Sequence, residues 1–255
     1  MEAQQQRTSL DSGTKLVGSD TAGWRFTLYP DAAEGGGSFR SAADGVPRGD
    51  ACDPRDSQAD ASRRAKTKVR RYCAANRLNR LGTLTYAGAG CHDPVQLRAD
   101  LAELFRRLRS AIGEPFPYLW VPEWHKTDHG LHAHFAVGRF IPVGLIREAW
   151  GRGFVHIEML NHLPVGSGAL GEARLAARYL AKYVGKDLGR ATDRAGLHRY
   201  EVAQGFQPRA FGLRGQTADE VVDWASVVMG RAPERVWRSR DVDDWAGPPS
   251  VSAQW

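Results

Sequence analysis

The sequence has little cysteine and no long apolar run. Its three cysteines, Cys52, Cys73 and Cys91, are scattered and form no Cys-x-x-Cys pair. This excludes a disulfide scaffold and a cysteine-rich zinc module, and it indicates a reducing cytosol. No stretch approaches the roughly 18 apolar residues needed to span a bilayer, so we expect no integral membrane protein. Residues 1–7 are polar, so we also expect no secretory signal and a cytoplasmic location.

The chain also lacks the nucleotide-binding motif G-x-x-x-x-G-K-[ST], so we expect neither ATPase nor helicase activity from it. Acidic residues are in the minority, with 29 Asp and Glu against 35 Lys and Arg, a net charge of +6. This excess favours a polyanionic partner. Hydrophobic residues make up 42% of the 255 residues, which is enough for a sizeable core.

Acidic residues are absent from one stretch that holds eight basic residues. A solvated helix face is the ordinary interpretation of such a run. Without any balancing carboxylate, however, phosphate is the natural counter-charge, and we predict that the run binds DNA. The eight residues are Arg63, Arg64, Lys66, Lys68, Arg70, Arg71, Arg77 and Arg80.

Large apolar residues are sparse in the first sixty residues, where Gly, Ser, Ala and Asp dominate. This composition predicts a flexible tail over residues 1–62, in which the alternating stretch 24–29 could add an edge strand. Residues 231–255 place three tryptophans among Asp and Pro, and we predict a second flexible tail there, with a partner-binding tail as the alternative. A single domain is then expected over residues 63–230.

Within this domain, apolar periodicity alternates between the strand and helix patterns. We predict an α+β fold: a central antiparallel sheet flanked by helices, related to ferredoxin-like and RRM-like arrangements. Turn residues at 126–130 join two of the strands into a hairpin. The predicted strands are 81–86, 117–125, 131–138, 154–160 and 198–203, and the predicted helices are 65–78, 94–113, 143–150, 169–186 and 217–229.

Two histidines, His132 and His134, lie two residues apart in an apolar strand, so both imidazoles lie on one face of the sheet. Glu123 lies on the partner strand of the hairpin, close to opposite them. Two imidazoles and a carboxylate suit Mn²⁺ or Zn²⁺, and Mg²⁺ is acceptable where phosphate and water complete the shell. His92 and His125 are alternatives to Glu123 as the third ligand, although ordinary surface histidines are commoner at such positions.

A second cluster, R-Y-L-A-K-Y-V-G-K, spans residues 178–186. On a helix, Tyr179 and Tyr183 lie one turn apart on one face, with Lys182 and Lys186 beside them. Two tyrosines at this spacing commonly just pack against a sheet, but flanking lysines away from the apolar arc are less typical of packing. An activated phenol is a covalent nucleophile, and a phosphodiester is the electrophile that fits a basic protein with a metal site.

Three motifs in this order resemble those of the HUH endonuclease superfamily, and within it the rolling-circle replication initiators of plasmids and small phages. They are L-G-T-L-T-Y at 81–86, L-H-A-H-F-A-V at 131–137 and Y-L-A-K-Y-V-G-K at 179–186. A Glu nine residues before the first histidine also matches family members that use Glu as the third ligand. The two-tyrosine form is similar to that of small isometric phage initiators. Gly82 departs from the first motif and suggests a bulge.

The resemblance implies a metal-dependent nickase and strand transferase that uses Mg²⁺ or Mn²⁺ and acts on single-stranded or melted DNA at an origin. The tyrosine would become joined to the 5′-phosphate, and the 3′-hydroxyl would then prime a host polymerase, with host replication helicase and polymerase as partners. We favour Tyr183 as the first nucleophile, because A-K-Y-x-x-K matches the single-tyrosine relatives better. The alternatives are a single-strand transposase or mobilisation relaxase with the same site, and a non-catalytic DNA-binding module.

Overall fold

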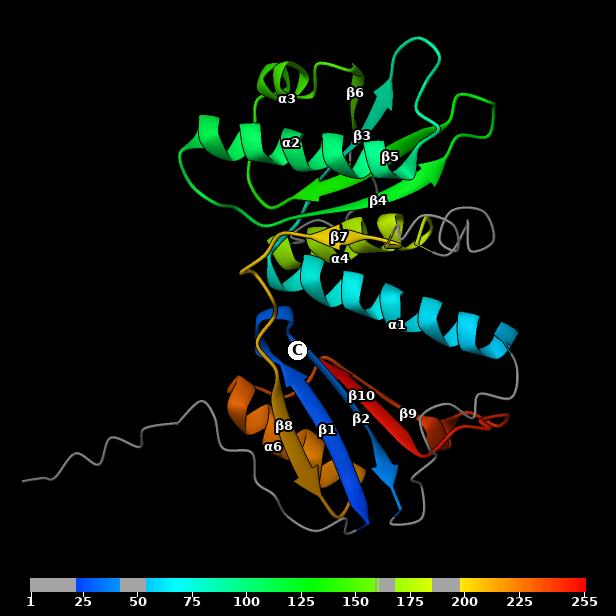
Figure 1. Cartoon of the computed structure of the whole chain (residues 1–255). Coiled ribbons are helices and arrows are strands. Elements are labelled where there is room, and N and C mark those ends of the chain that lie inside the picture. The colour runs from blue at the N-terminus through cyan, green and yellow to red at the C-terminus, as the bar shows by residue number, and fades with distance from the viewer. Residues whose placement is uncertain (1–21, 42–53, 159, 161–167, 185–197) are drawn as a thin grey trace, which may run out of the picture.

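The computed structural model describes residues 22–41, 54–158, 160, 168–184 and 198–255. These residues form two antiparallel five-stranded sheets with helices packed against them (Figure 1). The predicted α+β class, with an antiparallel sheet flanked by helices, is confirmed. None of the helices within these ranges is both long and apolar enough to cross a membrane.

The central sheet has the strand order β6-β3-β5-β4-β7. Its middle strand, β5 (Leu131–Val137), pairs with β3 (Arg80–Tyr86) and with β4 (Tyr118–Trp124), while β6 (Gly153–Glu158) and β7 (Glu201–Val202) form the edges. Every residue of β5 is buried, because helices cover both faces of the sheet. The predicted strand 198–203 is reduced to the two residues of β7.

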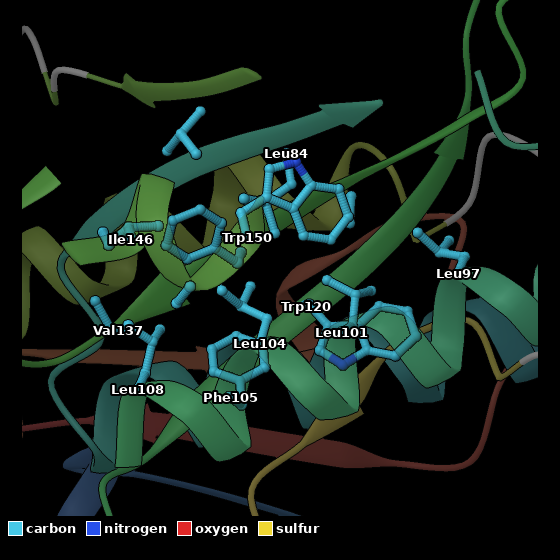
Figure 2. Packing of buried hydrophobic residues seen from close by; sticks show 14 of the residues in the cluster. Leu84, Leu97, Leu101, Leu104, Phe105, Leu108, Trp120, Val137, Ile146 and Trp150 are labelled. Atoms are coloured by element: carbon cyan, nitrogen blue, oxygen red, sulfur yellow. The ribbon is translucent and has the colours of Figure 1, made fainter. Parts of the chain in front are cut away.

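One face of the central sheet is covered by α2 (Pro94–Ile112) and α3 (Val143–Trp150). The leucines of α2 recur every three or four residues and so form one apolar face, which Figure 2 shows packed towards Trp120 and Trp150. The predicted ends of α2 are correct. The Asp93 carboxylate accepts a hydrogen bond from a first-turn N–H, and Gly113 ends the helix with a φ of 83°.

The other face is covered by α1 (Pro54–Ala75) and α4 (Ala169–Ala181). Val69 of α1 and Leu180 of α4 are fully buried with Val121 of β4 in the core on this side. The two helices pack closely because their contact faces are rich in alanine. Helix α1 begins before the predicted start at residue 65 and ends before residue 78.

The residues predicted as flexible tails contribute most of a second sheet, the terminal sheet, ordered β8-β1-β2-β10-β9. The suggested edge strand is present as β1, but it lies between β8 and β2. Trp255 is fully buried in the core of this sheet. The bounds are β1 Gly23–Tyr29, β2 Glu34–Arg40, β8 Phe211–Gly215, β9 Arg235–Arg238 and β10 Ser250–Gln254, with the short helices η1 Pro30–Ala32 and η2 Ser239–Asp241.

Helix α6 (Ala218–Met229) covers one face of the terminal sheet and supplies the apolar surface that the tails lack by themselves. Val221 and Ala225 of α6 are fully buried against Phe26 and Val251 of the strands. Each strand alone has only two or three apolar residues. The pattern therefore predicts disorder, whereas strands from both ends of the chain together bury a core.

Gly82 marks no bulge, because β3 pairs without interruption with β5 and with β6. A Cβ at this position would lie 2.5 Å from atoms of the Phe135 ring. The glycine instead makes room for that ring in the core of the sheet.

Candidate active site

The β4–β5 hairpin brings a carboxylate and two imidazoles to one point on the α1/α4 face of the central sheet. Glu123 lies directly opposite His132 in the strand register. Its Oε2 atom is 2.9 Å from His132 Nε2 and 2.7 Å from His134 Nε2, and the two Nε2 atoms are 3.2 Å apart. The sequence predicted that these three residues lie together, and the structure brings them together.

The chemistry and spacing of this Glu123/His132/His134 cluster fit a divalent cation. The three ligand atoms all lie within 4.8 Å of one another, and both histidines are buried. Two ligands about 2.1 Å from an ion and at right angles are about 3 Å apart, which agrees with the observed separations. The three residues could therefore hold a divalent cation such as Mg²⁺ or Mn²⁺ without rearrangement.

Thr83 of β3 positions one of the imidazoles, and the sequence analysis missed it. Its Oγ1 atom lies 3.0 Å from His134 Nδ1. When His134 Nε2 is left unprotonated for metal binding, Nδ1 carries the ring proton and donates it to the Thr83 hydroxyl. Thr83 pairs with His134 across the sheet, so knowledge of the strand order would have identified it within the first motif.

The two tyrosines lie against this cluster. The Tyr183 ring stacks on the His134 imidazole, with centroids 3.8 Å apart and planes 18° apart. Tyr179 meets the same imidazole at 6.0 Å and the Tyr183 ring at 5.2 Å, both edge to face. The Lys182 Nζ atom lies over the Tyr179 ring, 5.7 Å from its centre. The structure thus brings the predicted nucleophile residues next to the predicted metal ligands.

Tyr183 lies beyond the end of its helix, which corrects the predicted helix 169–186. Helix α4 ends at Ala181, and the Tyr183 N–H donates to the Leu180 carbonyl three residues back, as in a 3₁₀ turn. Val184 is buried and fixes this turn against the core. The tightened turn directs the Tyr183 ring onto the hairpin. Lys186, the other predicted catalytic lysine, lies outside the described residues.

Burial raises the pKa of the Tyr183 phenol well above its usual range, and a hydrogen bond with Tyr179 raises it further. The negative charges of Glu123 and Glu158 act in the same direction. The phenol is therefore protonated in this arrangement.

Neither alternative third ligand belongs to the cluster that the described residues form. The His125 Nδ1 atom is 2.6 Å from the Thr127 hydroxyl, and its ring lies 5.5 Å from the His132 ring. The His92 Nε2 atom lies 3.2 Å from the Ala89 carbonyl oxygen.

The basic run divides into structural and exposed residues. Arg70 and Arg71 both bind the carboxylate of Glu34, which is only 3% exposed, and so join α1 to the terminal sheet. Arg77 donates to the Asp31 carbonyl oxygen at 2.7 Å. The others are exposed on α1 or at the start of β3, and these are Arg63, Arg64, Lys66, Lys68 and Arg80.

Residues 79–188, somewhat less than half of the chain, match the ORF2 family of replication-associated proteins. The matched segment includes β3, the hairpin and α4, and therefore every residue of the cluster and both tyrosines. No curated protein and no solved structure matches the chain. The similarity supports a role as a replication initiator, which acts on DNA.

Proposed function

We propose that this protein is a metal-dependent, site-specific DNA endonuclease and strand transferase that starts rolling-circle replication. The observation that carries the proposal is the contact of Tyr183 with a Glu and two His that could hold a cation. The similarity to replication-associated proteins supports DNA as the substrate.

The proposed reaction is a transesterification. The Tyr183 oxygen attacks the phosphorus of a phosphodiester and loses its proton, the bond from phosphorus to the 3′-oxygen breaks, and a 3′-hydroxyl is released. The 5′-phosphate remains joined to the tyrosine. A divalent cation bound by Glu123, His132 and His134 would polarise the non-bridging oxygens of the scissile phosphate. Lys182 carries positive charge beside the phenols and stabilises negative charge that develops there.

Tyr179 is a second phenol within hydrogen-bonding reach of the first. After one round of synthesis it could attack a regenerated origin, so that the two linked strand ends are exchanged and replication stops. Because the phosphotyrosine bond conserves the energy of the phosphodiester, rejoining requires no ATP. Tyr183 is assigned the first attack, since its ring lies closer to that of His134.

The same site would serve a single-strand transposase or a mobilisation relaxase, which differ in their DNA target. A non-catalytic DNA-binding module is the alternative from another class. An intact pair of tyrosines beside an intact His-x-His argues against it, because a protein without catalysis has no need of both.

The test is to incubate the protein with single-stranded and supercoiled DNA plus Mn²⁺ and to look for a protein–DNA adduct that survives denaturant. We expect an adduct with the wild type and none with the double variant Tyr179→Phe, Tyr183→Phe. An adduct of equal yield from the double variant would contradict the assignment, and DNA binding without any adduct from the wild type would favour the binding module.

A further inference from the structure

A basic pocket lies between α1, the beginning of α2 and the chain leading into β7. Its volume is about 640 Å³. Cationic side chains reach it from all three elements: Arg64 and Lys68 from α1, Arg98 from α2, and Arg199 from the segment before β7. None of them is a ligand of the metal cluster or a neighbour of the tyrosines in the sequence.

The charge of this pocket is strongly one-sided. Glu201 is the one acidic residue among the described residues that line it, and its carboxylate pairs with Arg98 at 2.6 Å. Arg64 and Lys68 stand one helical turn apart, with Ala61 and Ala65 as small neighbours on the same side of α1. Their charges exceed what the pocket wall neutralises, so the pocket favours an anion.

Folding accounts for other cations of α1 but not for this pair. Arg70 and Arg71 hold Glu34, and Arg63 pairs with Asp60. Arg64 and Lys68 form no hydrogen bond or ion pair of this kind with the rest of the described chain, and both side chains are exposed. Two cations placed together without a structural partner suggest an external ligand.

The strand register places this pocket on the side of the candidate active site. Strand β7 runs antiparallel to β4, with Val202 opposite Leu119, so the residues before β7 lie towards the Glu123 end of β4. Tyr200 and Val202 pack against the same hydrophobic core as Tyr179 and Tyr183. Figure 1 shows β7 lying between β4 and α1. A DNA strand that leaves the metal cluster along β4 would therefore reach the pocket.

We propose that the pocket binds the phosphodiester backbone of the single strand next to the scissile phosphate. This rests on the proposed function, because it assumes that DNA lies at the cluster. Arg64 and Lys68 supply the charge for phosphate, and the partly buried Tyr200 in the pocket wall offers a ring on which a base can stack. The volume of the pocket suits a nucleotide unit rather than a duplex. The pocket would then hold the strand while it is cut and rejoined.

The test measures binding of fluorescent oligothymidylates of increasing length in EDTA, in the Tyr179→Phe, Tyr183→Phe background, so that no reaction occurs. Arg64→Ala, Lys68→Ala is compared with Arg63→Ala, Lys66→Ala, which removes the same charge from the same helix outside the pocket. For single strands, each lost phosphate contact lowers the salt slope by about 0.7, so we expect the pocket variant to lose about 1.4 and the control clearly less. The gain in affinity with length should also stop earlier in the pocket variant.

Equal losses of slope and affinity in the two double variants would overturn the pocket, because α1 would then act as diffuse charge. The adduct experiment is separate from this one. If the wild type forms no adduct while the pocket variant alone loses affinity, the proposed chemistry is wrong and the pocket is supported.

Discussion

The Tyr183 ring lies flat against the His134 imidazole, with centroids 3.8 Å apart. This contact joins two parts of the chain that are almost fifty residues apart, the β4–β5 hairpin and the turn after α4. It makes the phenol part of the wall of the metal cluster. Changes to the hairpin, to β3 or to this turn should therefore all affect one reaction.

Replacing His132 with alanine should abolish metal binding and adduct formation while duplex binding stays almost unchanged. Affinity for duplex DNA comes mainly from counterion release by basic residues, which this change leaves in place. Calorimetry with Mn²⁺, the adduct assay and a filter-binding assay measure the three properties. The control is His156→Ala, which removes an exposed histidine of β6. Equal loss of duplex binding and nicking would contradict the separation of the two functions.

Thr83→Val should weaken Mn²⁺ binding by roughly 10-fold or more, because loss of the hydroxyl leaves the His134 ring without its Nδ1 partner. The matched control is Thr85→Val on the same strand, since Thr85 makes no side-chain hydrogen bond within the described chain. Titration calorimetry measures the affinity, and thermal unfolding checks the fold. If the two variants bind Mn²⁺ equally well, Thr83 does not position the histidine.

Gly82→Ala should destabilise the protein by about 1–3 kcal/mol, because the new methyl group meets the Phe135 ring in a filled core. Gly36→Ala, also in a strand, is the control, since a Cβ there meets only ordinary contacts of 3.5 Å and more. Urea unfolding gives the free energies. Equal stability of the two variants would show that glycine is not needed next to Phe135.

Glu34→Ala should lower the free energy of unfolding by about 3 kcal/mol, because it removes the shared partner of Arg70 and Arg71 from a buried position. Asp60→Ala breaks the exposed ion pair with Arg63 and should leave stability unchanged. Urea unfolding of both variants checks this. A Glu34 variant as stable as wild type would mean that the link between α1 and the terminal sheet contributes little.

Local patterns predicted the centre of the candidate site. The hairpin is short and its turn is marked by polar residues, so the register that pairs Glu123 with His132 follows from the sequence. Thr83 did not follow, because its contact with His134 depends on which distant strand lies beside β5. The place of Tyr183 depended on the tightened turn after Ala181, whereas the 3.6-residue period predicts a continuous helix.

The terminal sheet shows the limit of local reasoning. Strand β1 has few apolar residues and β2 is mostly glycine and polar residues, so each alone resembles a linker. Their partners, β8, β9 and β10, lie about 170 residues or more further along the chain. The basic run misled for a similar reason. Arg70 and Arg71 serve Glu34, which is remote in sequence and lies within the predicted tail.

Mapping the residue that becomes attached to DNA tests the central claim most directly. The wild-type protein is incubated with Mn²⁺ and a pool of single-stranded DNA, and the denaturant-resistant adduct is digested with nuclease and trypsin. Trypsin cleaves after Arg178, Lys182 and Lys186, so the two tyrosines fall in different peptides. Mass spectrometry should find the nucleotide on Tyr183 in the first product, and on Tyr179 in Tyr183→Phe if the second phenol can substitute. Attachment to a residue outside these two peptides, or no covalent product at all, would contradict the account.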